Sequence, residues 1–535
     1  MNETDIKDYW AIPEFDLRKN QEIALDWMQE QLTTNDSKYL ILELPVGSGK
    51  SLLGLTLSKY LNKGNGSSFV LTPQRILQDQ YEKDFEVLGK KFLASLHGKS
   101  NYKCQSKGAS CKIGSLVKPP CEHCPFASAK NYARNASNTV LNYKLALTSF
   151  QYTETFEPRK LMILDEAHTL EQHLVDFDSV DITYAMCKKY DINFKVHTEI
   201  QTAMEWVKAE YLPVLEEHLS DMEADCEMLF EKASNELTRG DLNKIKETEE
   251  LAGHVADVMD MSMRTDDYLE ENFVLVWDKV MFAFKRISGS YSFHKIIKPM
   301  ADKFLFMSST ILNKDTFCRD LGIDPDDVSF LSLPSEFSVD NRPVVYMPVM
   351  KMNASWNKPE NASHRSAMVE RIISLLDIHE GDSGILHTAN YAIAQWLVEQ
   401  LDGKISHNIY HHNPKGDMDR QEAINNYIDS TLPAILISPS ITEGLDLKDD
   451  LARFAMVVKV PFGYLGDQWI KRRMEMSMEW YRRRAITDII QGGGRIVRGL
   501  DDEGTVYILD ASFAYLYQQS YNMVPQWWKD SYQTL

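Results

Sequence analysis

The feature that most constrains this chain is a glycine-rich turn that follows an apolar run. Residues 39–44, Tyr-Leu-Ile-Leu-Glu-Leu, have the composition of a buried strand, and residues 52–61 continue as a helix. The turn between them consists of Pro45, Val46, Gly47, Ser48, Gly49, Lys50 and Ser51. Backbone N–H groups at such a strand-to-helix turn converge on phosphate at the helix N-terminus. The turn therefore predicts a nucleotide phosphate site in an α/β domain.

The side chains of this turn suit a nucleoside triphosphate and its metal ion. Lys50 would contact the β- and γ-phosphates, and Ser51 would bind magnesium. The strict phosphate-loop pattern requires glycine where this chain has Leu44. An ordinary glycine-rich turn before a helix is therefore the alternative interpretation.

A pair of carboxylates follows a second apolar run. Asp165 and Glu166 come directly after residues 161–164, Leu-Met-Ile-Leu. Because parallel strands deliver functional groups to one edge of a sheet, both carboxylates should face the crevice of the phosphate loop. Asp165 suits Mg²⁺, and Glu166 suits the orientation of an attacking water. A capped helix start with incidental acidic residues is the alternative.

Three glycines lie between a glutamine and two arginines near the C-terminus. Residues 491–498 read Gln-Gly-Gly-Gly-Arg-Ile-Val-Arg, which places Arg495 and Arg498 on one face if the segment is helical. Such arginines can reach across a domain interface and stabilise the charge that develops on a γ-phosphate. A solvated basic helix is the alternative.

The order of these motifs resembles that of the iron–sulfur group of superfamily 2 DNA helicases, which includes DinG and XPD. The resemblance covers nearly the whole chain, and the group's phosphate loop also lacks the first glycine. The matching segments are 18–21 (R-x-x-Q), 71–75 (motif Ia), 165–168 (the DEAH box), 308–310 (Ser-Ser-Thr, for S-A-T), 438–446 (motif V) and 491–498 (motif VI). Six motifs in this order are specific, although each is weak alone.

The resemblance implies an ATP site with Mg²⁺ between two motor lobes. It assigns catalytic roles to Lys50, Asp165, Glu166, Arg495 and Arg498. It assigns further nucleotide contacts to Arg18, Gln21 (at the base), Pro45, Gly47, Ser48, Gly49, Ser51, Gly444, Asp446 and Gln491. DNA contacts would come from Thr72, Arg75, Thr388, Ser440 and Thr442, each of which is otherwise an ordinary polar residue at a strand end.

Four of the seven cysteines lie close together. Cys104, Cys111, Cys121 and Cys124 have the spacing C-x6-C-x9-C-x2-C, and so few cysteines in a long chain do not form a disulfide framework. Four thiolates can bind a [4Fe-4S] cluster or tetrahedral zinc, and spacing does not decide between them. Their place between motif Ia and the DEAH box resembles that of the family's cluster, although the spacing is more compact. The resemblance therefore implies iron–sulfur, with zinc or four unligated thiols as alternatives.

The chain as a whole is predicted to be α/β, with two RecA-like motor lobes. The first lobe would comprise residues 1–98, 139–170 and 299–334, interrupted by a cysteine module at 99–138 and an insertion at 171–298. The insertion has helical periodicity and few glycines or prolines, and it occupies the place of the family's arch domain. It either packs on the motor or grips DNA. Residues 335–535 would form the second lobe, with strands near 384–387, 434–437, 455–458 and 505–508.

Composition sets limits on location and partners. The formal charge of −20 argues mildly against nucleic acid, but it says little about a local groove. The basic runs at 471–473 and 482–484 would line a DNA track or form a solvated face. No apolar run approaches the roughly 18 residues that span a membrane, and the N-terminus lacks a signal pattern. We expect a monomeric protein of the cytoplasm of a bacterium or a phage-infected cell, without membrane contact.

The resemblance implies 5′-to-3′ movement on single-stranded DNA and opening of forked or tailed duplexes near the metal module. About 40 residues precede the phosphate loop, so we expect no N-terminal exonuclease of the kind that some DinG relatives carry. Two other functions would give the same motifs: an ATP-gated clamp that does not unwind, and an RNA-directed motor. The sequence does not identify a protein partner.

Overall fold

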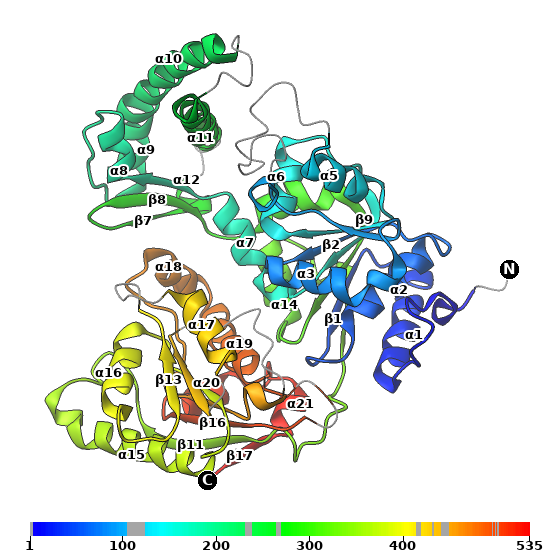
Figure 1. Ribbon diagram of the computed structural model, residues 1–535, viewed down its shortest axis with the longest axis vertical. Helices are drawn as coiled ribbons and strands as arrows, with labels where there is room; N and C mark the ends of the chain where they lie inside the picture. The colour runs from blue at the N-terminus through cyan, green and yellow to red at the C-terminus, as the bar shows by residue number, and fades with distance from the viewer. Residues whose placement is uncertain are drawn as a thin grey trace.

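The structure is a computed structural model, and it describes residues 4–103, 123–230, 238–263, 269–413, 419–430, 433–439, 449–494, 496–497, 499 and 502–535. It contains two lobes, each built on a β-sheet, and a third unit whose long helices extend away from the lobes (Figure 1). Within the described ranges, no helix combines the length and apolar character that a membrane crossing requires.

The first lobe is built on a seven-stranded parallel sheet in the order β10-β1-β9-β5-β2-β4-β3. Its strands are β1 (Tyr39–Glu43), β2 (Ser68–Thr72), β3 (Leu93–Ser95), β4 (Asn138–Asn142), β5 (Arg159–Leu164), β9 (Ala301–Ser308) and β10 (Val328–Ser332). Because β1, β9, β5 and β2 are neighbours and parallel, the segments that follow them lie at one edge of the sheet. The phosphate loop, the Ser-Ser-Thr turn, the DEAH box and motif Ia are those segments.

The first strand shows why these runs are apolar at every position. Tyr39 and Ile41 pack in one buried cluster, whereas Leu40 and Leu42 pack in another on the opposite face. A parallel strand covered on both faces requires apolar side chains throughout. One face is covered by α1 (Lys19–Thr33), α2 (Lys50–Leu61) and α3 (Arg75–Asp84). The other is covered by α5 (Pro125–Asn135), α6 (Tyr143–Tyr152), α7 (Leu170–Phe177) and α14 (Lys314–Leu321).

The second lobe has its own seven-stranded parallel sheet, in the order β13-β14-β12-β15-β16-β11-β17. Its strands are β11 (Val344–Met350), β12 (Gly384–His387), β13 (Asn408–His411), β14 (Ala434–Ser438), β15 (Phe454–Val457), β16 (Thr505–Asp510) and β17 (Tyr532–Thr534). Its helices are α15 (Ala362–Ile378), α16 (Tyr391–Leu401), α17 (Arg420–Ile428), α18 (Gln468–Met476), α19 (Met478–Gly493), α20 (Phe513–Ser520) and α21 (Gln526–Lys529). The predicted α/β class with two parallel-sheet lobes is confirmed.

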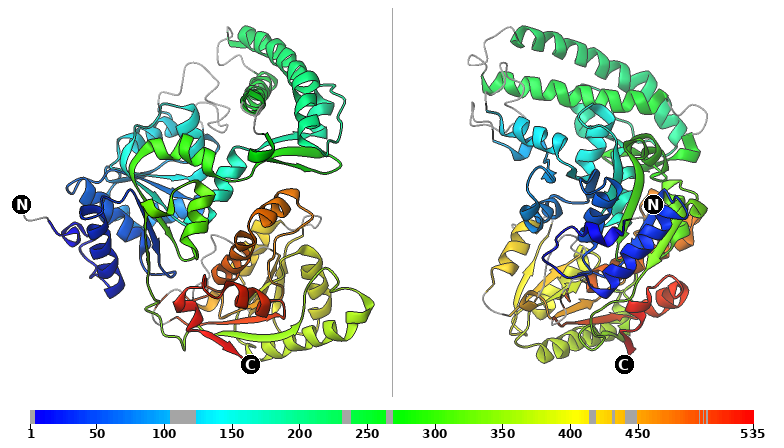
Figure 2. Two further views of the ribbon diagram at one scale, coloured as in Figure 1. Left: turned by 180° about the vertical axis from the view of Figure 1, so that it is seen from behind. Right: turned by 90° about the vertical axis from the view of Figure 1, so that its right-hand side faces the viewer.

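The third unit differs from its prediction, because it is not helical throughout. It contains an antiparallel sheet, β6-β8-β7, formed by β6 (Val180–Thr183), β7 (Phe273–Trp277) and β8 (Met281–Arg286). These strands are short and flank a long helical stretch, whose periodicity dominates the pattern. The helices are α8 (Tyr184–Lys189), α9 (Ile200–Trp206), α10 (Leu212–Phe230), α11 (Arg239–Met263) and α12 (Leu269–Asn272), with α13 (Ser290–Ser292) after the sheet. Figure 2 shows α10 and α11 side by side.

Candidate active site

The phosphate loop between β1 and α2 has two backbone positions that favour glycine. Gly47 and Gly49 have φ angles of 77° and 79°, in the left-handed region. A Cβ atom on Gly49 would lie 2.4 Å from Nε2 of Gln21. A side chain at Gly49 would be strained and would also clash, whereas glycine fits both positions. The loop ends at Lys50, the first residue of α2.

Arg18 and Gln21 lie against this loop. Nη2 of Arg18 donates to the backbone oxygen of Gly47 at 2.8 Å, and Nε2 of Gln21 donates to that of Ser48 at 3.0 Å. The backbone N–H of Arg18 donates to Oε1 of Gln21 at 3.0 Å, which joins the two residues. Both were predicted to hold the nucleotide, and in this structure both support the shape of the loop.

A cavity of about 500 Å³ opens beside the phosphate loop. Its wall includes Gly47, Gly49, Lys50 and Ser51 from the loop and Asp165 and Glu166 from the DEAH box. Nζ of Lys50 donates to the backbone oxygens of Leu44 and Pro45, at 3.1 and 3.2 Å. An ammonium group, a hydroxyl and a helix N-terminus at one cavity form a donor set that fits a triphosphate.

Asp165 is buried at the wall of this cavity, with 8% of its surface exposed. Burial and the neighbouring Glu166 carboxylate raise the pKa of Asp165 to about 6, whereas the Lys50 ammonium lowers it. The hydroxyl of Tyr81 donates to its Oδ2 at 3.2 Å. Two adjacent carboxylates beside a triphosphate cavity fit Mg²⁺, which binds through few carboxylates together with water and phosphate oxygens.

Glu166 has a strained backbone. Its φ of 47° lies in the left-handed region, which is unusual for a residue with a long side chain. Oε2 of Glu166 lies 3.3 Å from Nδ1 of His168, and the same nitrogen lies 2.8 Å from Oγ of Ser308 at the end of β9. Such strain is typical of functional sites. Here the strained residue places a carboxylate on the cavity wall, and His168 links that carboxylate to Ser308 on the neighbouring strand β9.

The second lobe contacts the first through Gln491, near the C-terminal end of α19. Gln491 lines a separate cavity of about 440 Å³ together with His168 and Thr310. Its Nε2 donates to Oγ of Ser309 at 3.0 Å and to Oγ1 of Thr310 at 2.7 Å. Gln491 is 6% exposed, so this contact is shielded from water. The motif VI glutamine and the Ser-Ser-Thr turn, which are far apart in sequence, thus form one hydrogen-bonded junction between the lobes.

Nine residues predicted for the nucleotide site, the DNA contacts and the metal module lie outside the described ranges. They are Cys104, Cys111, Cys121, Ser440, Thr442, Gly444, Asp446, Arg495 and Arg498. Their roles stay predictions.

The described candidates for DNA contact differ in exposure. Thr72 and Thr388 are fully buried, and each hydroxyl donates at 3.2 Å to the backbone oxygen two residues further along the chain. The side chain of Arg75 is 58% exposed. Of these three candidates, Arg75 alone presents its side chain at the surface.

Cys124 is the predicted metal ligand that falls within the described residues. It is the N-cap of α5, and its Sγ accepts a hydrogen bond from the backbone N–H of Ala127 at 3.5 Å. Cysteine binds metals through its sulfur, so Cys124 has a ligand atom at the start of α5. The nearby Tyr102 ring packs on Phe126, with the ring centroids 5.5 Å apart. Tyr102 thus supports the start of α5.

A buried ion network also joins the lobes, and sequence patterns did not indicate it. Nη2 of Arg473 on α18 lies 2.5 Å from Glu171 on α7 and 2.7 Å from Asp320 on α14. Arg483 on α19 also pairs with Asp320, and the indole N–H of Trp480 donates to Glu171 at 2.9 Å. Burial and Asp320 raise the pKa of Glu171 to about 7, whereas the two arginines lower it. Arg473 and Arg483 belong to the two basic runs; Arg473 is buried, whereas Arg483 also lines, with Arg484, the cavity of about 440 Å³ between the lobes.

Two protein families match parts of this chain. The helicase C-terminal domain matches residues 372–531, and the res subunit of type III restriction enzymes matches residues 14–197. The first range includes β12 to β16 of the second lobe, and the second includes β1 to β5 of the first.

Curated relatives carry helicase names. The ATP-dependent DNA helicase YoaA of Haemophilus influenzae is 22% identical, over 73% of this chain and 67% of that protein. The ATP-dependent DNA helicase DinG of Photobacterium profundum is 26% identical, over 41% of this chain and 33% of that protein. The chain thus aligns with about two thirds of the first relative and a third of the second.

Solved XPD structures share the fold. A structure named XPD helicase superposes with a TM-score of 0.64 at 17% identity, covering 97% of this chain and all of that one. The Xpd4 structure of S. tokodaii gives 0.54 at 12% identity, over 97% of this chain and all of that one. By sequence the chain is similar to the YoaA and DinG helicases and by fold it is similar to XPD, so it is DinG/XPD-like. The two parallel-sheet lobes are RecA-like and match those of the XPD structure.

Proposed function

We propose that this chain is an ATP-dependent DNA helicase that moves 5′-to-3′ along single-stranded DNA and separates duplex strands. The observation that carries this proposal is the hydrogen bonding of Gln491 to Ser309 and Thr310, with Nε2 of Gln491 3.5 Å from Nδ1 of His168 in the DEAH box. Because a residue of the second lobe meets the turn next to the DEAH box, a change at the nucleotide can move one lobe relative to the other. The names of the relatives YoaA and DinG favour DNA as the track.

Each group at the cavity has a separate task in this proposal. Lys50, Ser51 and the loop N–H groups bind the phosphates, and Asp165 takes the metal ion. Bound Mg²⁺ supplies positive charge that neutralises the phosphate oxygens. Glu166 orients the attacking water and is held at the cavity wall by its turn. From the second lobe, Gly444, Asp446 and Gln491 complete the pocket, and Arg495 and Arg498 stabilise the charge on the γ-phosphate.

Single-stranded DNA would cross the carboxyl ends of the strands in both lobes. Arg75 is suited to a phosphate contact because its side chain is exposed. Thr72 and Thr388 shape the strand-end turns whose backbone N–H groups would face the DNA, with Ser440 and Thr442 beside them in the second lobe. Forked or tailed duplexes would open near the cysteine module at 99–138.

The four cysteines are proposed to hold a [4Fe-4S] cluster that keeps this module folded, with zinc as the alternative. Replacing Cys121 by serine should remove iron from the purified protein and reduce unwinding roughly tenfold or more, while ATP hydrolysis falls less. Iron analysis, visible absorption and strand displacement on one anaerobic preparation measure this. Cys226→Ser is the matched control, because Cys226 lies outside the four-cysteine motif. Its thiol lies 3.2 Å from the Thr248 hydroxyl, so a serine hydroxyl at this position would have a hydrogen-bond partner. Full unwinding by metal-free protein would contradict the assigned role.

The proposed function is tested by measuring ATP hydrolysis with and without single-stranded DNA, in parallel with single-stranded RNA. We expect strong stimulation by DNA and little by RNA. Stimulation by RNA instead would identify an RNA-directed motor. DNA binding that depends on ATP but leaves duplexes intact would identify a clamp.

The junction between the lobes gives a second prediction. Gln491→Ala should lower the stimulation of ATP hydrolysis by DNA about tenfold, because a hydrogen-bonded contact between the lobes is lost. Affinity for ATP in the absence of DNA should fall by less than this, because the first lobe supplies the main phosphate contacts. Gln421→Ala on the exposed face of α17 is the control. Normal DNA stimulation in Gln491→Ala would remove this residue from the coupling.

A further inference from the structure

Helix α3 lies between the nucleotide cavity and residues 95–101, which we call the base of the cysteine segment at 99–138. The cavity is lined from this helix by Leu77, Gln80, Tyr81 and Asp84. Two residues turn an α-helix by about 200°, so the residues two positions before each of these lie on nearly the opposite face. That opposite face contacts residues 95–101 through Arg75, Gln78, Asp79 and Glu82. One helix thus touches both predicted functional regions, through opposite faces.

Tyr81 is the residue of α3 that contacts Asp165, the predicted metal ligand at the cavity wall. Its hydroxyl donates to Oδ2 of Asp165 at 3.2 Å, and Ser51 lines the same cavity. Tyr81 is 4% exposed, and its ring packs on Phe85 with the centroids 5.7 Å apart. Because packing fixes the ring, the hydroxyl has a fixed position beside the predicted metal ligand Asp165.

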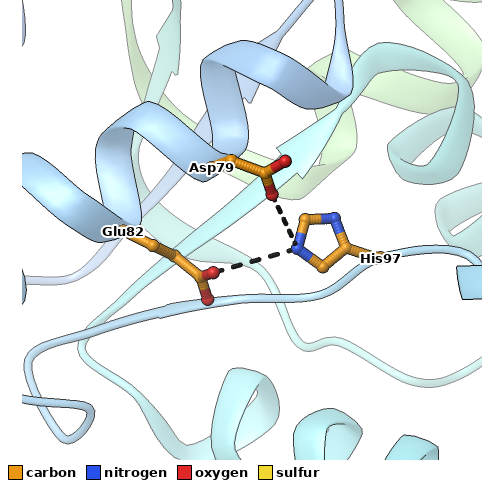
Figure 3. Close-up of side chains that lie close together, drawn as sticks. All are labelled: Asp79, Glu82 and His97. Atoms are coloured by element: carbon orange, nitrogen blue, oxygen red, sulfur yellow. Dashed lines mark ion pairs between the residues drawn. The ribbon is translucent and has the colours of Figure 1, made fainter. Parts of the chain in front are cut away.

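The opposite face of α3 is attached to His97, directly before the cysteine segment. Figure 3 shows the ring of His97 facing both carboxylates from the helix. Its Nε2 lies 3.4 Å from Asp79 and 3.9 Å from Glu82. The nearby His97 ring lowers the pKa of Glu82, because it stabilises the charged carboxylate.

These three side chains are of types that bind divalent cations, but the ring geometry argues against a metal site. A metal-bound histidine donates its other ring N–H to an acceptor. Nδ1 of His97 is buried and has no hydrogen-bond partner among the described residues. A metal on Nε2 would leave a buried N–H unsatisfied at Nδ1, which costs stability. We therefore interpret the cluster as a clasp between α3 and the base of the cysteine segment.

Two further contacts fix the same face. Gln78 is fully buried, and its Nε2 donates to the backbone oxygen of Leu96 at 3.1 Å. Nη1 of Arg75 donates to Oδ1 of Asn101 at 2.7 Å. A displacement of residues 95–101 would therefore be passed to α3 as a whole, because three successive contacts hold the helix to that segment.

We propose that Tyr81 is a positioning residue for the metal ion of the nucleotide, and that α3 links it to the cysteine segment. The inference rests on the proposed function, since it requires Asp165 and Ser51 to receive Mg²⁺. A hydroxyl bonded to Asp165 holds this ligand in place before the ion arrives, and preorganised ligands bind more tightly. A displacement of residues 95–101 would reach Asp165 through α3.

The test is the effect of Mg²⁺ on binding of a fluorescent ATP analogue, compared with the same titration in EDTA. In the wild type, Mg²⁺ should tighten binding. Tyr81→Phe should lose roughly tenfold of this tightening, because a residue behind the metal ligands has lost its hydrogen bond. Its affinity in EDTA should equal that of the wild type, which a general structural defect would not preserve.

Tyr143→Phe is the matched control. Its buried hydroxyl donates to the backbone oxygen of the same Asp165 at 2.8 Å but not to the carboxylate, so this variant should keep the Mg²⁺ effect. Full Mg²⁺ tightening in Tyr81→Phe, or an equal loss in both variants, would overturn the role of Tyr81. A wild type that does not bind the analogue would refute the nucleotide site itself, and the inference with it.

The link through α3 is tested in the same assay at its other end. His97→Ala releases the clasp without touching the cavity, and it should reduce the Mg²⁺ effect in the same direction as Tyr81→Phe but by less. Lys83→Ala, on an exposed position of α3, is the control. If His97→Ala and Lys83→Ala give the same Mg²⁺ effect as the wild type, the link to the cysteine segment is refuted.

Discussion

Lys50→Ala should lower the rate of ATP hydrolysis by about 10²–10³-fold or more, which is the range for losing one preorganised charge-stabilising group. Lys50 begins α2 at the cavity wall, where its ammonium group donates to the oxygens of Leu44 and Pro45. No other lysine or arginine lines this cavity among the residues described for it. The variant should therefore lose the main positive charge available to the phosphates.

The fold should survive this change, because the Lys50 side chain is only partly buried and makes no ion pair within the described structure. Hydrolysis of ATP and the melting temperature should be measured on the same preparation. Lys19→Ala is the control, since Lys19 is an exposed lysine near the loop that does not line the cavity. Wild-type ATP hydrolysis in Lys50→Ala would remove the motor from this account.

Arg473→Leu should reduce the free energy of unfolding by about 3–5 kcal/mol, the range for removing one partner of a buried ion pair. The side chains of Arg473 and Asp320 are 7% and 5% exposed, so both carboxylate partners would lose a cation in a site shielded from water. Because Glu171 lies on α7 and Arg473 on α18, the substitution also weakens the contact between the lobes. The melting temperature should fall and the radius of gyration should rise.

This loss should depend on pH. The pKa of Glu171 is about 7 with Arg473 present, and loss of the arginine raises the pKa further. A carboxyl whose folded pKa lies above its unfolded value stabilises the fold at low pH and loses that contribution as the pH rises through the folded pKa. The deficit of Arg473→Leu relative to the wild type should therefore grow above about pH 7. Thermal melts at pH 6 and pH 8.5 measure this.

Arg472→Leu provides the matched control, because Arg472 is the preceding residue of α18 and is exposed. It should melt like the wild type. Equal melting temperatures for Arg472→Leu and Arg473→Leu would mean that the ion network does not hold the lobes together.

The strands and the phosphate loop could be predicted from sequence because their signals are local. Residues 39–44 are apolar at every position since both faces of β1 are covered, and Gly47 and Gly49 occupy backbone conformations that favour glycine. The carboxyl edge of a parallel sheet then determines where the DEAH box must lie.

The other contacts had no local signal. Tyr81 and Asp165 are separated by 84 positions, and Arg473 and Glu171 by 302. A tyrosine in a polar helix and an arginine in a basic run look like ordinary surface residues, because burial depends on the packing of distant elements. The three strands of the third unit were missed for a related reason, since β6 pairs with β8 across the long helical stretch between them.

Strand displacement on DNA duplexes with a single-stranded tail tests the central claim most directly. With ATP and Mg²⁺, the wild type should release the shorter strand from a duplex with a 5′ tail. It should leave a duplex with a 3′ tail intact, and Lys50→Ala should release neither. ATP hydrolysis that DNA stimulates without release of either strand would contradict the helicase, and release from the 3′-tailed duplex alone would contradict the direction.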